Sequence, residues 1–366
     1  MIPFFTFNFK KNEIKEKIIY SIEALIDSEK YILGHNTSVF QKKYSELTNS
    51  KYCVGVGSGL DALIISLKSL GIQKGDEVIV PSNTYVASWL AVSSVGATIV
   101  PVEPDIRTYN IDPDLIEEKI TKKTKAILPV HLYGQACDMN RIMEIAKANN
   151  LFVIEDNAQA HLAKWAGKHT GTFGNINATS FYPTKNIGAI GEAGAITTNQ
   201  ESLYNFAKKY RNYGSEIRYN NEIKGVNSRI DEIQAAILNI KLKYVADMTK
   251  ERIKNASIYN ALLADINIIL PYTNPHAKHV YHLYVIRHKR RDKLKDFLYK
   301  KGIQTDIHYP IIPQHQKAYS DQYFKKSPIS YEIASTCLSL PIYPGLKKSQ
   351  IQHICKSIEE FCENDK

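Results

Sequence analysis

Short apolar runs alternate with longer amphipathic segments between residues 50 and 200. Runs such as "EVIVPS", "KAILPVHLYG" and "LFVIED" are rich in aliphatic residues, as buried strands are, and the segment "MNRIMEIAKANN" between two of them has helical spacing. An alternation of this kind is typical of βαβ units, in which a helix connects two parallel strands. The sequence therefore predicts an α/β fold with a mainly parallel sheet flanked by helices.

The character of the chain changes near residue 245. A charged helix is expected from Lys241 to Asn260. Beyond it follow the strand-like run "HVYHLYVIRH", a helix at residues 291–301 and the segment "GIQTDIHYP", a pattern suited to a small α/β domain. We therefore expect a large domain over residues 1–245 and a smaller C-terminal domain over residues 246–366.

The net charge of +10 raises the question of whether the chain binds nucleic acid. Its basic residues are spread through helix-like segments such as "IEEKITKKTKA" and are interleaved with acidic ones, which is typical of solvated helix faces. The sequence therefore predicts no nucleic-acid partner. A small anionic ligand, such as a phosphorylated cofactor, is compatible with the charge.

The sequence also argues against a membrane protein, a disulfide-bonded protein and a metalloprotein. No run of eighteen apolar residues is present and the first residues lack the pattern of a signal peptide, so a cytoplasmic location is expected. The five cysteines form no C-x-x-C pair, which indicates reduced thiols. His276, His279 and His282 lie in a run with strand-like alternation that would scatter them, so no metal site is expected.

Three groups follow predicted strands, and parallel strands present their carboxyl ends to ligands. Asp156 ends the run "LFVIED", where it is placed either to meet a ligand or to cap a following helix. The turn "VGVGSGLDAL" offers backbone N–H groups, the Ser58 hydroxyl and a helix N-terminus to a phosphate, although its glycine spacing is not that of a dinucleotide-binding fold. Tyr85 follows the next strand, where its ring either stacks on a planar cofactor or packs in the core.

Lys185 lies in the apolar, glycine-rich stretch "SFYPTKNIGAIGEAGAI", where a lysine is uncommon unless it is paired or reactive. A lysine, an aspartate, a phosphate-binding turn and an aromatic ring at one edge of a sheet are the parts that hold pyridoxal 5′-phosphate (PLP). The lysine bonds to its aldehyde, the aspartate keeps the pyridine nitrogen protonated, and the helix N-terminus takes the phosphate. A lysine that reaches out of its loop to solvent is the alternative.

Five motifs occur together in a characteristic order: "GSGLDAL", "PSNTYVAS", "VIEDNAQAH", "SFYPTKNIGAIGEAGAITTN" and "GVNSRIDEIQAA". In these motifs the chain resembles the DegT/StrS-type sugar-nucleotide aminotransferases of PLP fold type I. The resemblance extends from "YILGHNTSVF" to "LSLPIYPGL" and so covers almost the whole chain. It implies a seven-stranded, mainly parallel large domain of the aspartate aminotransferase type, a smaller C-terminal α/β domain, and a homodimer with active sites at the subunit interface.

The resemblance assigns cofactor contacts residue by residue. Lys185 matches the lysine that bonds to the cofactor, Asp156 the partner of the pyridine nitrogen, and Gln159 a residue near the ring hydroxyl. Ser58, Gly59 and Ser180 match phosphate ligands, and Tyr85 matches the stacking aromatic. Asn227 matches an asparagine that reaches the phosphate of the other subunit's cofactor.

Four further positions match residues that contact the sugar nucleotide in relatives, namely Tyr182, Arg218, His308 and Tyr309. Arg218 would be supplied by the other chain. A guanidinium group binds phosphate oxygens in pairs, which suits the diphosphate of a sugar nucleotide. The chain departs from the family's pattern at Glu192, where aspartate is usual.

The resemblance also implies a reaction. The segment "GIQTDIHYPIIPQHQ", together with His161, looks like relatives that aminate C3 of dTDP-linked 3-keto-6-deoxyhexoses, with L-glutamate as amino donor. We therefore expect a PLP-dependent aminotransferase that makes an aminosugar for a surface glycan, such as an O-antigen or S-layer glycan. The alternatives are an enzyme that aminates C4 of a UDP- or dTDP-linked 4-ketosugar and a PLP-binding regulator without turnover. Dehydratases among the relatives carry histidine in place of the lysine, so Lys185 argues against that class.

Overall fold

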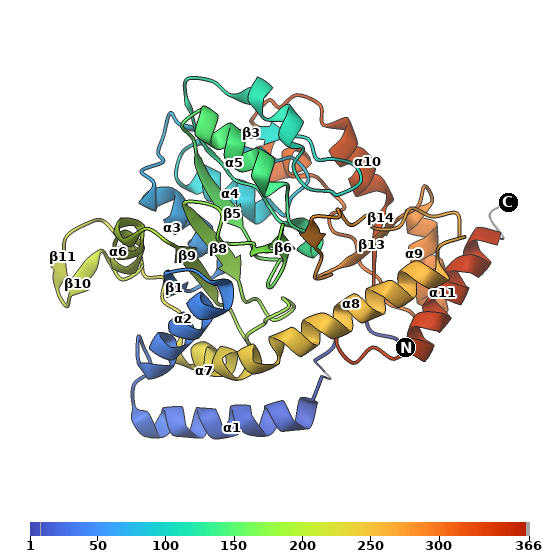
Figure 1. Ribbon diagram of the computed structural model, residues 1–366, viewed down its shortest axis with the longest axis horizontal. Coiled ribbons are helices and arrows are strands. Elements are labelled where there is room, and N and C mark those ends of the chain that lie inside the picture. The colour runs from blue at the N-terminus through green and yellow to red at the C-terminus, as the bar shows by residue number, and fades with distance from the viewer. Residues whose placement is uncertain (8, 364–366) are drawn as a thin grey trace.

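A computed structural model describes residues 1–7 and 9–363 of the chain. Its centre is a seven-stranded sheet in which β9 runs antiparallel to both of its neighbours and the other adjacent pairs are parallel (Figure 1). In spatial order its strands are β1 (Tyr52–Val56), β9 (Gly194–Thr198), β8 (Ile176–Ser180), β5 (Phe152–Asp156), β4 (Thr124–Ile127), β2 (Glu77–Pro81) and β3 (Thr98–Val102). The expected seven-stranded, mainly parallel sheet is confirmed.

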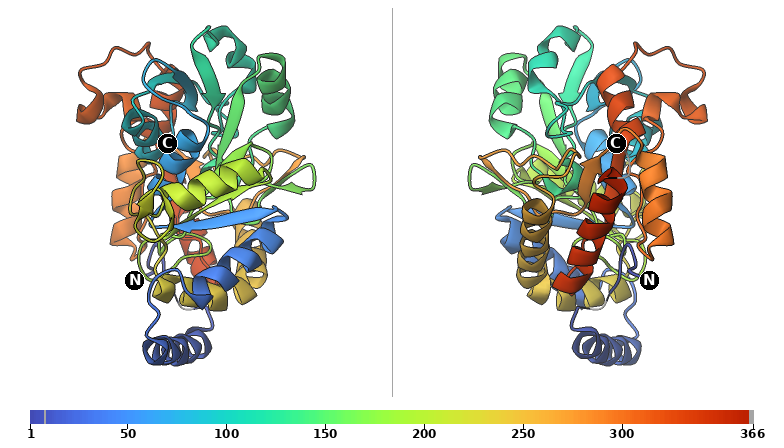
Figure 2. Two further views of the ribbon diagram at one scale, coloured as in Figure 1. Left: turned by 90° about the vertical axis from the view of Figure 1, so that its left-hand side faces the viewer. Right: turned by 90° about the vertical axis from the view of Figure 1, so that its right-hand side faces the viewer.

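Helices flank this sheet and continue into the C-terminal part of the chain. Their bounds are α1 (Lys11–Ser28), α2 (His35–Thr48), α3 (Gly59–Ser69), α4 (Val86–Ser94), α5 (Met139–Ala148), α6 (Glu201–Tyr210), α7 (Glu232–Lys241), α8 (Val245–Leu262), α9 (Arg291–Lys300), α10 (Pro328–Thr336) and α11 (Lys348–Glu363). Helix α1 packs against α7 at the periphery of the molecule, as the views in Figures 1 and 2 agree. Among the described residues, every helix is too short or too polar to cross a lipid bilayer.

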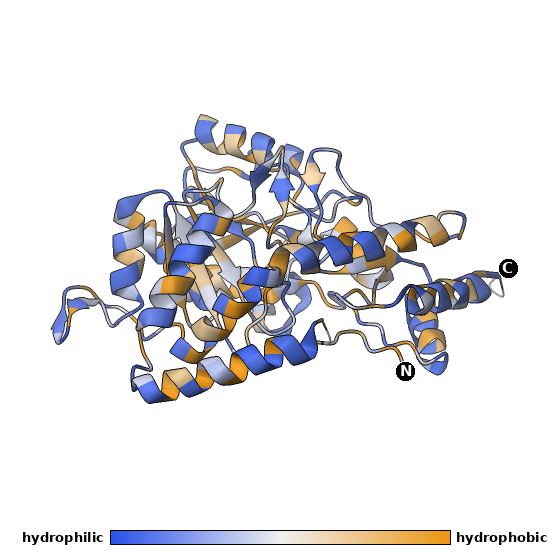
Figure 3. Cartoon of the chain, turned by 60° about the horizontal axis from the view of Figure 1, so that its bottom comes forward, coloured by the Kyte–Doolittle hydropathy of each residue, from blue (hydrophilic) through white to orange (hydrophobic). Residues whose placement is uncertain are grey.

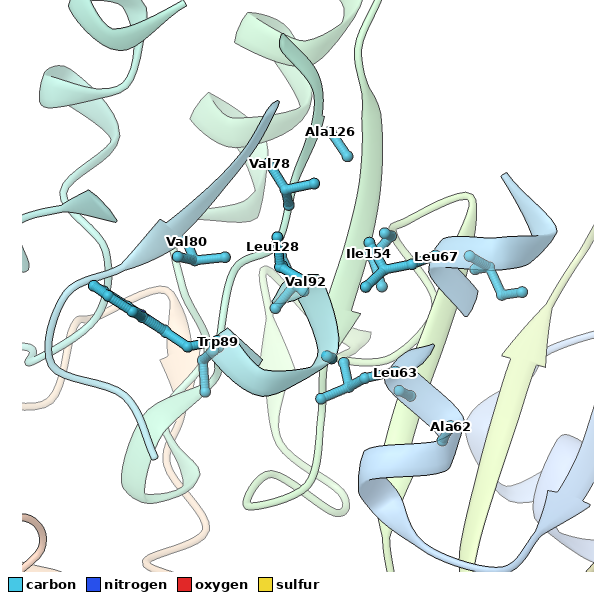
Figure 4. Close-up of a cluster of buried hydrophobic side chains, with 14 of the residues drawn as sticks. Ala62, Leu63, Leu67, Val78, Val80, Trp89, Val92, Ala126, Leu128 and Ile154 are labelled. Carbon is cyan, nitrogen blue, oxygen red and sulfur yellow. The ribbon is translucent and has the colours of Figure 1, made fainter. Parts of the chain in front are cut away.

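Alternate residues of each strand are buried on opposite faces of the sheet. Val78 of β2 packs with Leu63 of α3 and Trp89 of α4 on one face (Figure 4), whereas the next residue, Ile79, packs with Ile142 of α5 on the other. All five are at most 2% exposed. Burial of one such side chain contributes about 1.5–3 kcal/mol, so the two helix layers fix the sheet from both sides.

The carboxyl ends of the parallel strands lie at one edge of the sheet, where helix α3 begins. Ser58 ends the turn after β1 and caps α3, because its Oγ accepts a hydrogen bond of 3.1 Å from the N–H of Asp61. Strand β1 therefore delivers both a serine hydroxyl and a helix N-terminus to the edge where parallel sheets bind ligands.

The C-terminal part is built on the antiparallel pair β13 (Tyr284–Arg287) and β14 (Cys337–Leu340). The helix expected from Lys241 begins at Val245 instead, because α7 runs up to Lys241 and a short 3-10 turn separates the two helices. Two pairings connect the parts on either side of residue 245: a parallel bridge from Ile2 to Ile303, and β12 (Ala277–Lys278) against β6 (Lys164–Trp165). The division into domains at residues 245 and 246 remains a prediction.

Two further strand pairings complete the described elements. β7 (Lys168–His169) pairs with β6, and β10 (Ser215–Ile217) and β11 (Asn220–Asn221) form a short hairpin beyond α6. The hairpin projects from the body of the protein at the end that is opposite to α11 (Figure 1).

The strand expected over "HVYHLYVIRH" is shorter than predicted, because β13 begins only at Tyr284. The residues before it bond to the loop that follows β4. The N–H of Val280 donates to the carbonyl oxygen of Gly134 (2.9 Å), and the N–H of Leu283 donates to that of Tyr133 (3.3 Å). Segment 280–283 is therefore fixed to the carboxyl edge of the central sheet rather than paired with β14.

Gly134 makes this close approach possible. Its φ is +99°, and a Cβ on it would lie 2.8 Å from the backbone nitrogen of His282. Gly75 provides a matched control, because it has the same φ of +99° and nothing within 4 Å of a Cβ. We expect Gly75→Ala to lose about 1 kcal/mol of unfolding free energy from backbone strain alone, and Gly134→Ala to lose about 2 kcal/mol more from the added collision. Urea denaturation followed by fluorescence measures both losses, and equal losses would contradict the close approach.

Candidate active site

A cavity of about 560 Å³ opens at the carboxyl edge of the sheet. All the residues predicted for the site line this cavity, except Asn227 and Arg218. The predicted residues that line it are Ser58, Gly59, Tyr85, Asp156, Gln159, Ser180, Tyr182, Lys185, His308 and Tyr309. The parallel strands and the C-terminal segment thus bring residues from both ends of the chain into one cavity.

The turn between β1 and α3 forms an anion-binding corner of the cavity. The first N–H groups of a helix have no partners within it and carry partial positive charge. Gly59 lies so close to the end of β8 that a Cβ on it would be 2.6 Å from the Cβ of Ser180. The hydroxyls of Ser58 and Ser180 and the N-terminus of α3 therefore meet at one place, which suits a phosphate group.

Asp156 is the last residue of β5 and is 6% exposed. Its Oδ1 accepts a hydrogen bond from the N–H of Ala158 (3.1 Å) and its Oδ2 accepts one from Ser88 Oγ (2.9 Å). A turn rather than a helix follows, so the alternative role of Asp156 as a helix cap is not seen. Burial raises the pKa of Asp156 above its ordinary value, while these hydrogen bonds and the charge of Lys185 oppose the rise.

Ser88 was not singled out from the sequence, although it ends the motif "PSNTYVAS" that carried Tyr85. It is buried on α4, three residues beyond Tyr85. Residues three apart lie on one side of a helix, so the ring and the hydroxyl that holds Asp156 come from the same turn.

Lys185 lies in the loop between β8 and β9 and is half-buried. Its N–H donates to the carbonyl oxygen of Tyr182 (2.8 Å). Burial lowers the pKa of the Lys185 amine to about 8, and the negative charges of Asp156 and Glu192 oppose the change. The side chain lines the cavity, unlike a lysine that extends into bulk solvent. About half of the amine is therefore neutral, and nucleophilic, at pH 8, whereas an ordinary lysine is almost entirely protonated there.

A series of hydrogen bonds connects the wall of the cavity to the C-terminal segment. Gln159 accepts from the N–H of Tyr133 (2.7 Å) and donates through Nε2 to the hydroxyl of Tyr309 (2.9 Å). Tyr133 donates through its own hydroxyl to the carbonyl oxygen of His308. The ring of Tyr309 lies 5.2 Å from that of Tyr85, which is 53% exposed and therefore not a core residue.

Three histidines near the cavity have different roles. His308 lies in its wall, with Nδ1 2.9 Å from Ser339 Oγ, and burial lowers its pKa despite the nearby Asp306. His161 does not line the cavity; it lies under the lysine loop, where its Nδ1 accepts from the N–H of Ile187 (3.4 Å), and burial lowers its pKa to about 3. His282 lines the cavity, which strand-like alternation did not predict. Among the described residues, no cluster of acids, cysteines and histidines is suited to a metal ion.

The neighbouring acid Glu155 points away from the cavity. It is fully buried and accepts hydrogen bonds from the N–H groups of Gly171, Phe173 and Gly174 (2.6–2.8 Å). Its Oε2 also lies 2.8 Å from Nε2 of His131. Of the acidic pair that ends β5, one carboxylate therefore fixes a loop and the other faces the cavity.

Asn227 and Arg218 lie away from the cavity of their own chain, and both are exposed. Arg218 is in the β10–β11 hairpin, where its guanidinium carbon lies 4.8 Å from the centre of the Tyr219 ring. The loop of Asn227 is anchored through Ser228, whose hydroxyl donates to Asp61 Oδ2 (2.9 Å). The structure thus gives neither residue a role in its own subunit's cavity.

These features fit pyridoxal phosphate. The corner of Ser58, Gly59 and Ser180 has the donors that a phosphate needs, the buried carboxylate of Asp156 suits a protonated pyridine nitrogen, and Lys185 supplies an amine of lowered pKa. With the mainly parallel sheet, they define a PLP-dependent enzyme of fold type I.

The chain belongs to the DegT/DnrJ/EryC1/StrS aminotransferase family, whose sequence pattern matches residues 12–359. It is 48% identical to the dTDP-3-amino-3,6-dideoxy-alpha-D-galactopyranose transaminase of Aneurinibacillus thermoaerophilus, over 99% of both chains. It is 40% identical to the dTDP-3-amino-3,4,6-trideoxy-alpha-D-glucose transaminase of Streptomyces venezuelae, over 99% of this chain and 96% of the other. The crystal structure of S. venezuelae DesV in complex with a ketimine intermediate superposes with a TM-score of 0.97 at 41% identity, covering 99% of this chain and 98% of that one.

The lowered pKa of Lys185 predicts how its reactivity depends on pH. Only the neutral amine attacks an aldehyde, so the rate at which cofactor-free protein bonds PLP should rise with pH, with a midpoint near 8. In Glu192→Gln the midpoint should move to lower pH, because the negative charge that is removed had stabilised the ammonium form. Stopped-flow absorbance measures the rates, with Glu144→Gln on the exposed side of α5 as control. A midpoint at the ordinary lysine value of 10.5 would contradict the burial of the amine.

Proposed function

We propose that the protein transfers the amino group of L-glutamate to the C3 carbonyl of a dTDP-linked 3-keto-6-deoxyhexose. The observation that carries this proposal is the 48% identity, over 99% of both chains, to a transaminase named for the 3-amino-3,6-dideoxygalactose product. The intact lysine site supports turnover rather than a purely regulatory role. The proposal includes the predicted cytoplasmic location and a role in making an aminosugar for surface glycans.

The proposed residue roles follow from their chemistry. Pyridoxal phosphate, when bound, supplies an electron-withdrawing ring that stabilises the carbon from which a proton is removed. Ser58, Gly59 and Ser180 would hold its phosphate, Asp156 would keep a proton on its ring nitrogen, and Tyr85 would cover one face of the ring. Nζ of Lys185 would take a proton from the substrate carbon and deliver it to the cofactor carbon that bears the transferred nitrogen, since its lowered pKa suits both accepting and donating. Gln159, through Tyr309, would fix the opposite wall.

The sugar nucleotide is proposed to bind between Tyr182, His308 and Tyr309, which line the cavity. Its diphosphate would be bound by Arg218 of the partner subunit, and the partner subunit's Asn227 would reach the cofactor phosphate. Both roles require a homodimer, because each residue is exposed and does not line its own cavity.

Exposed apolar side chains support this homodimer. Figure 3 shows apolar residues among the polar ones of α1, and Ile19 and Ile26 of this helix are 46% and 58% exposed. The β10–β11 hairpin carries a second group, in which Ile217 and Tyr219 are 69% and 85% exposed. Apolar side chains gathered on an exposed helix and hairpin are typical of protein interfaces. A second copy of the chain is the proposed occupant.

A spectroscopic experiment tests the first half of the reaction. Protein loaded with PLP should show a visible absorption band that L-glutamate bleaches, because the amino group passes to the cofactor. Lys185→Ala should neither complete this reaction nor retain the cofactor covalently after borohydride reduction, whereas wild type retains it. A covalent adduct in the variant would contradict the assignment of Lys185.

A hybrid experiment tests the shared active site. Lys185→Ala and Arg218→Ala homodimers should each be inactive or strongly impaired with the aminosugar nucleotide. If Arg218 acts across the interface, a hybrid dimer has one intact site, so an equal mixture that exchanges subunits should recover about a quarter of wild-type activity. Activity is measured after mixing under mild denaturant, with a mixture of Lys185→Ala and wild type as control. No recovery despite demonstrated exchange would contradict a role of Arg218 across the interface.

A further inference from the structure

We propose that His282 is a specificity-determining residue that accepts a hydrogen bond from a sugar hydroxyl next to the aminated carbon. This inference rests on the proposed function, because it concerns the sugar nucleotide that the site would bind. It assigns a role to a histidine that the strand-like pattern of residues 279–288 did not suggest.

The hydrogen bonds of His282 define which ring nitrogen carries the proton. Its Nδ1 lies 3.2 Å from Oδ1 of Asn186, and Asn186 is oriented by donating through Nδ2 to the carbonyl oxygen of Val280 (3.4 Å). An amide oxygen can only accept, so Nδ1 of His282 is the donor. In a neutral ring Nε2 then carries a lone pair, and this atom has no hydrogen-bond partner among residues 1–7 and 9–363.

The ring is neutral because of its surroundings. His282 is 8% exposed, and burial together with the positive charges of Lys185 and Arg252 lowers its pKa well below the ordinary value. Protonation near neutral pH is therefore disfavoured, and Nε2 acts as an acceptor rather than as an acid.

The backbone of His282 is held rigidly in place. Nη1 of the buried Arg252 lies 3.3 Å from the carbonyl oxygen of His282 and donates to it. On the other side, the N–H groups of Val280 and Leu283 donate to the carbonyl oxygens of Gly134 and Tyr133. An acceptor that is fixed before the ligand arrives loses little entropy on binding, and this makes its hydrogen bond selective.

His282 lies where the main cavity meets a second one. The adjoining cavity, of about 260 Å³, is otherwise lined mainly by apolar residues such as Phe4, Phe5 and Leu283. Four residues line both cavities, namely Tyr182, Thr184, His282 and His308. A ligand that reacts at Lys185 and extends toward His308 therefore passes the ring of His282.

The chemistry of the two proposed substrates decides what Nε2 accepts. Beyond its reacting amine, L-glutamate offers carboxylates, which are acceptors and cannot pair with a lone pair. A hexose offers hydroxyl donors on the carbons next to C3. Burying Nε2 against a sugar without that hydroxyl would leave the acceptor unpaired, which is how sites of this kind reject deoxy analogues. His282 is thus expected to act on the sugar nucleotide and to require a hydroxyl at C2 or C4.

The test compares sugar nucleotides in the direction from aminosugar to ketosugar, with PLP-loaded protein and 2-oxoglutarate, the keto acid of L-glutamate, as the amino acceptor. The substrates are dTDP-3-amino-3,6-dideoxygalactose and its analogues that lack the hydroxyl at C4 or at C2. Wild type should react with one of the two analogues roughly tenfold less efficiently than with the parent, measured as kcat/KM. His282→Asn keeps a donor toward Asn186, but its shorter side chain places no acceptor at the position of Nε2. This variant should therefore lower kcat/KM for the parent and abolish the preference. In His282→Gln the amide oxygen of the new side chain can replace Nε2 as acceptor, so this variant should restore part of the preference for the parent.

A second histidine and a second readout separate this role from a structural one. His279 is also buried, but it stacks on Tyr281 at 3.9 Å and lines neither cavity, so His279→Asn should keep the wild-type preference. In calorimetry, the three sugar nucleotides are titrated into cofactor-free protein, where no turnover occurs. The ratios of their Kd values should show the same preference for the parent.

The outcomes distinguish the inference from the proposed function. Wild type that reacts equally well with the parent and both analogues would overturn the role of His282 and leave the proposed function intact. The same holds for a His282→Asn protein that keeps the wild-type preference. A protein that is bleached by L-glutamate but reacts with none of the aminosugars would overturn the proposed C3 substrate, and the inference with it.

Discussion

The common direction of the parallel strands is the constraint on which the site depends. Strands β1, β2, β4, β5 and β8 all end at one edge of the sheet: β2, β4, β5 and β8 pair in parallel, and β1 runs in the same direction because β9 is antiparallel to both β1 and β8. Their loops must therefore meet there. The helix N-terminus after β1, the carboxylate at the end of β5 and the serine at the end of β8 come together for this reason, although they are scattered along the chain.

Burial then gives these groups their chemical character. Asp156 is buried and Lys185 half-buried in the cavity wall, so the carboxyl has a raised pKa and the amine a lowered one, and each moderates the shift of the other. Ser88 and the N–H of Ala158 keep the carboxylate oriented. The site thus combines a carboxylate held by fixed donors with a lysine of lowered pKa, which is the electrostatic combination that aminotransfer requires.

The alternation of apolar runs and amphipathic segments was sufficient to predict a mainly parallel sheet. The seven strands, the family and most candidate residues of the cavity came from the resemblance of five ordered motifs. The sequence singled out Asp156 but gave no role to Glu155, because the N–H groups that bind Glu155 belong to a loop 16 to 19 residues further along the chain. It also missed His282, because the run around it alternates like a strand while its backbone is in fact bonded to the loop of Tyr133 and Gly134. Contacts between distant segments leave no periodic signal in either segment.

The attachment of segment 280–283 to the loop after β4 has a consequence for folding. The cavity is closed by contacts between residues about 150 positions apart in the chain, and contacts of such long range form slowly because the intervening loop must first be closed. The cavity is complete only when this C-terminal wall lies against the large sheet. Tight binding of cofactor and substrate therefore requires the last part of the chain, and by binding the native state alone these ligands would favour the completely folded protein over partly folded forms.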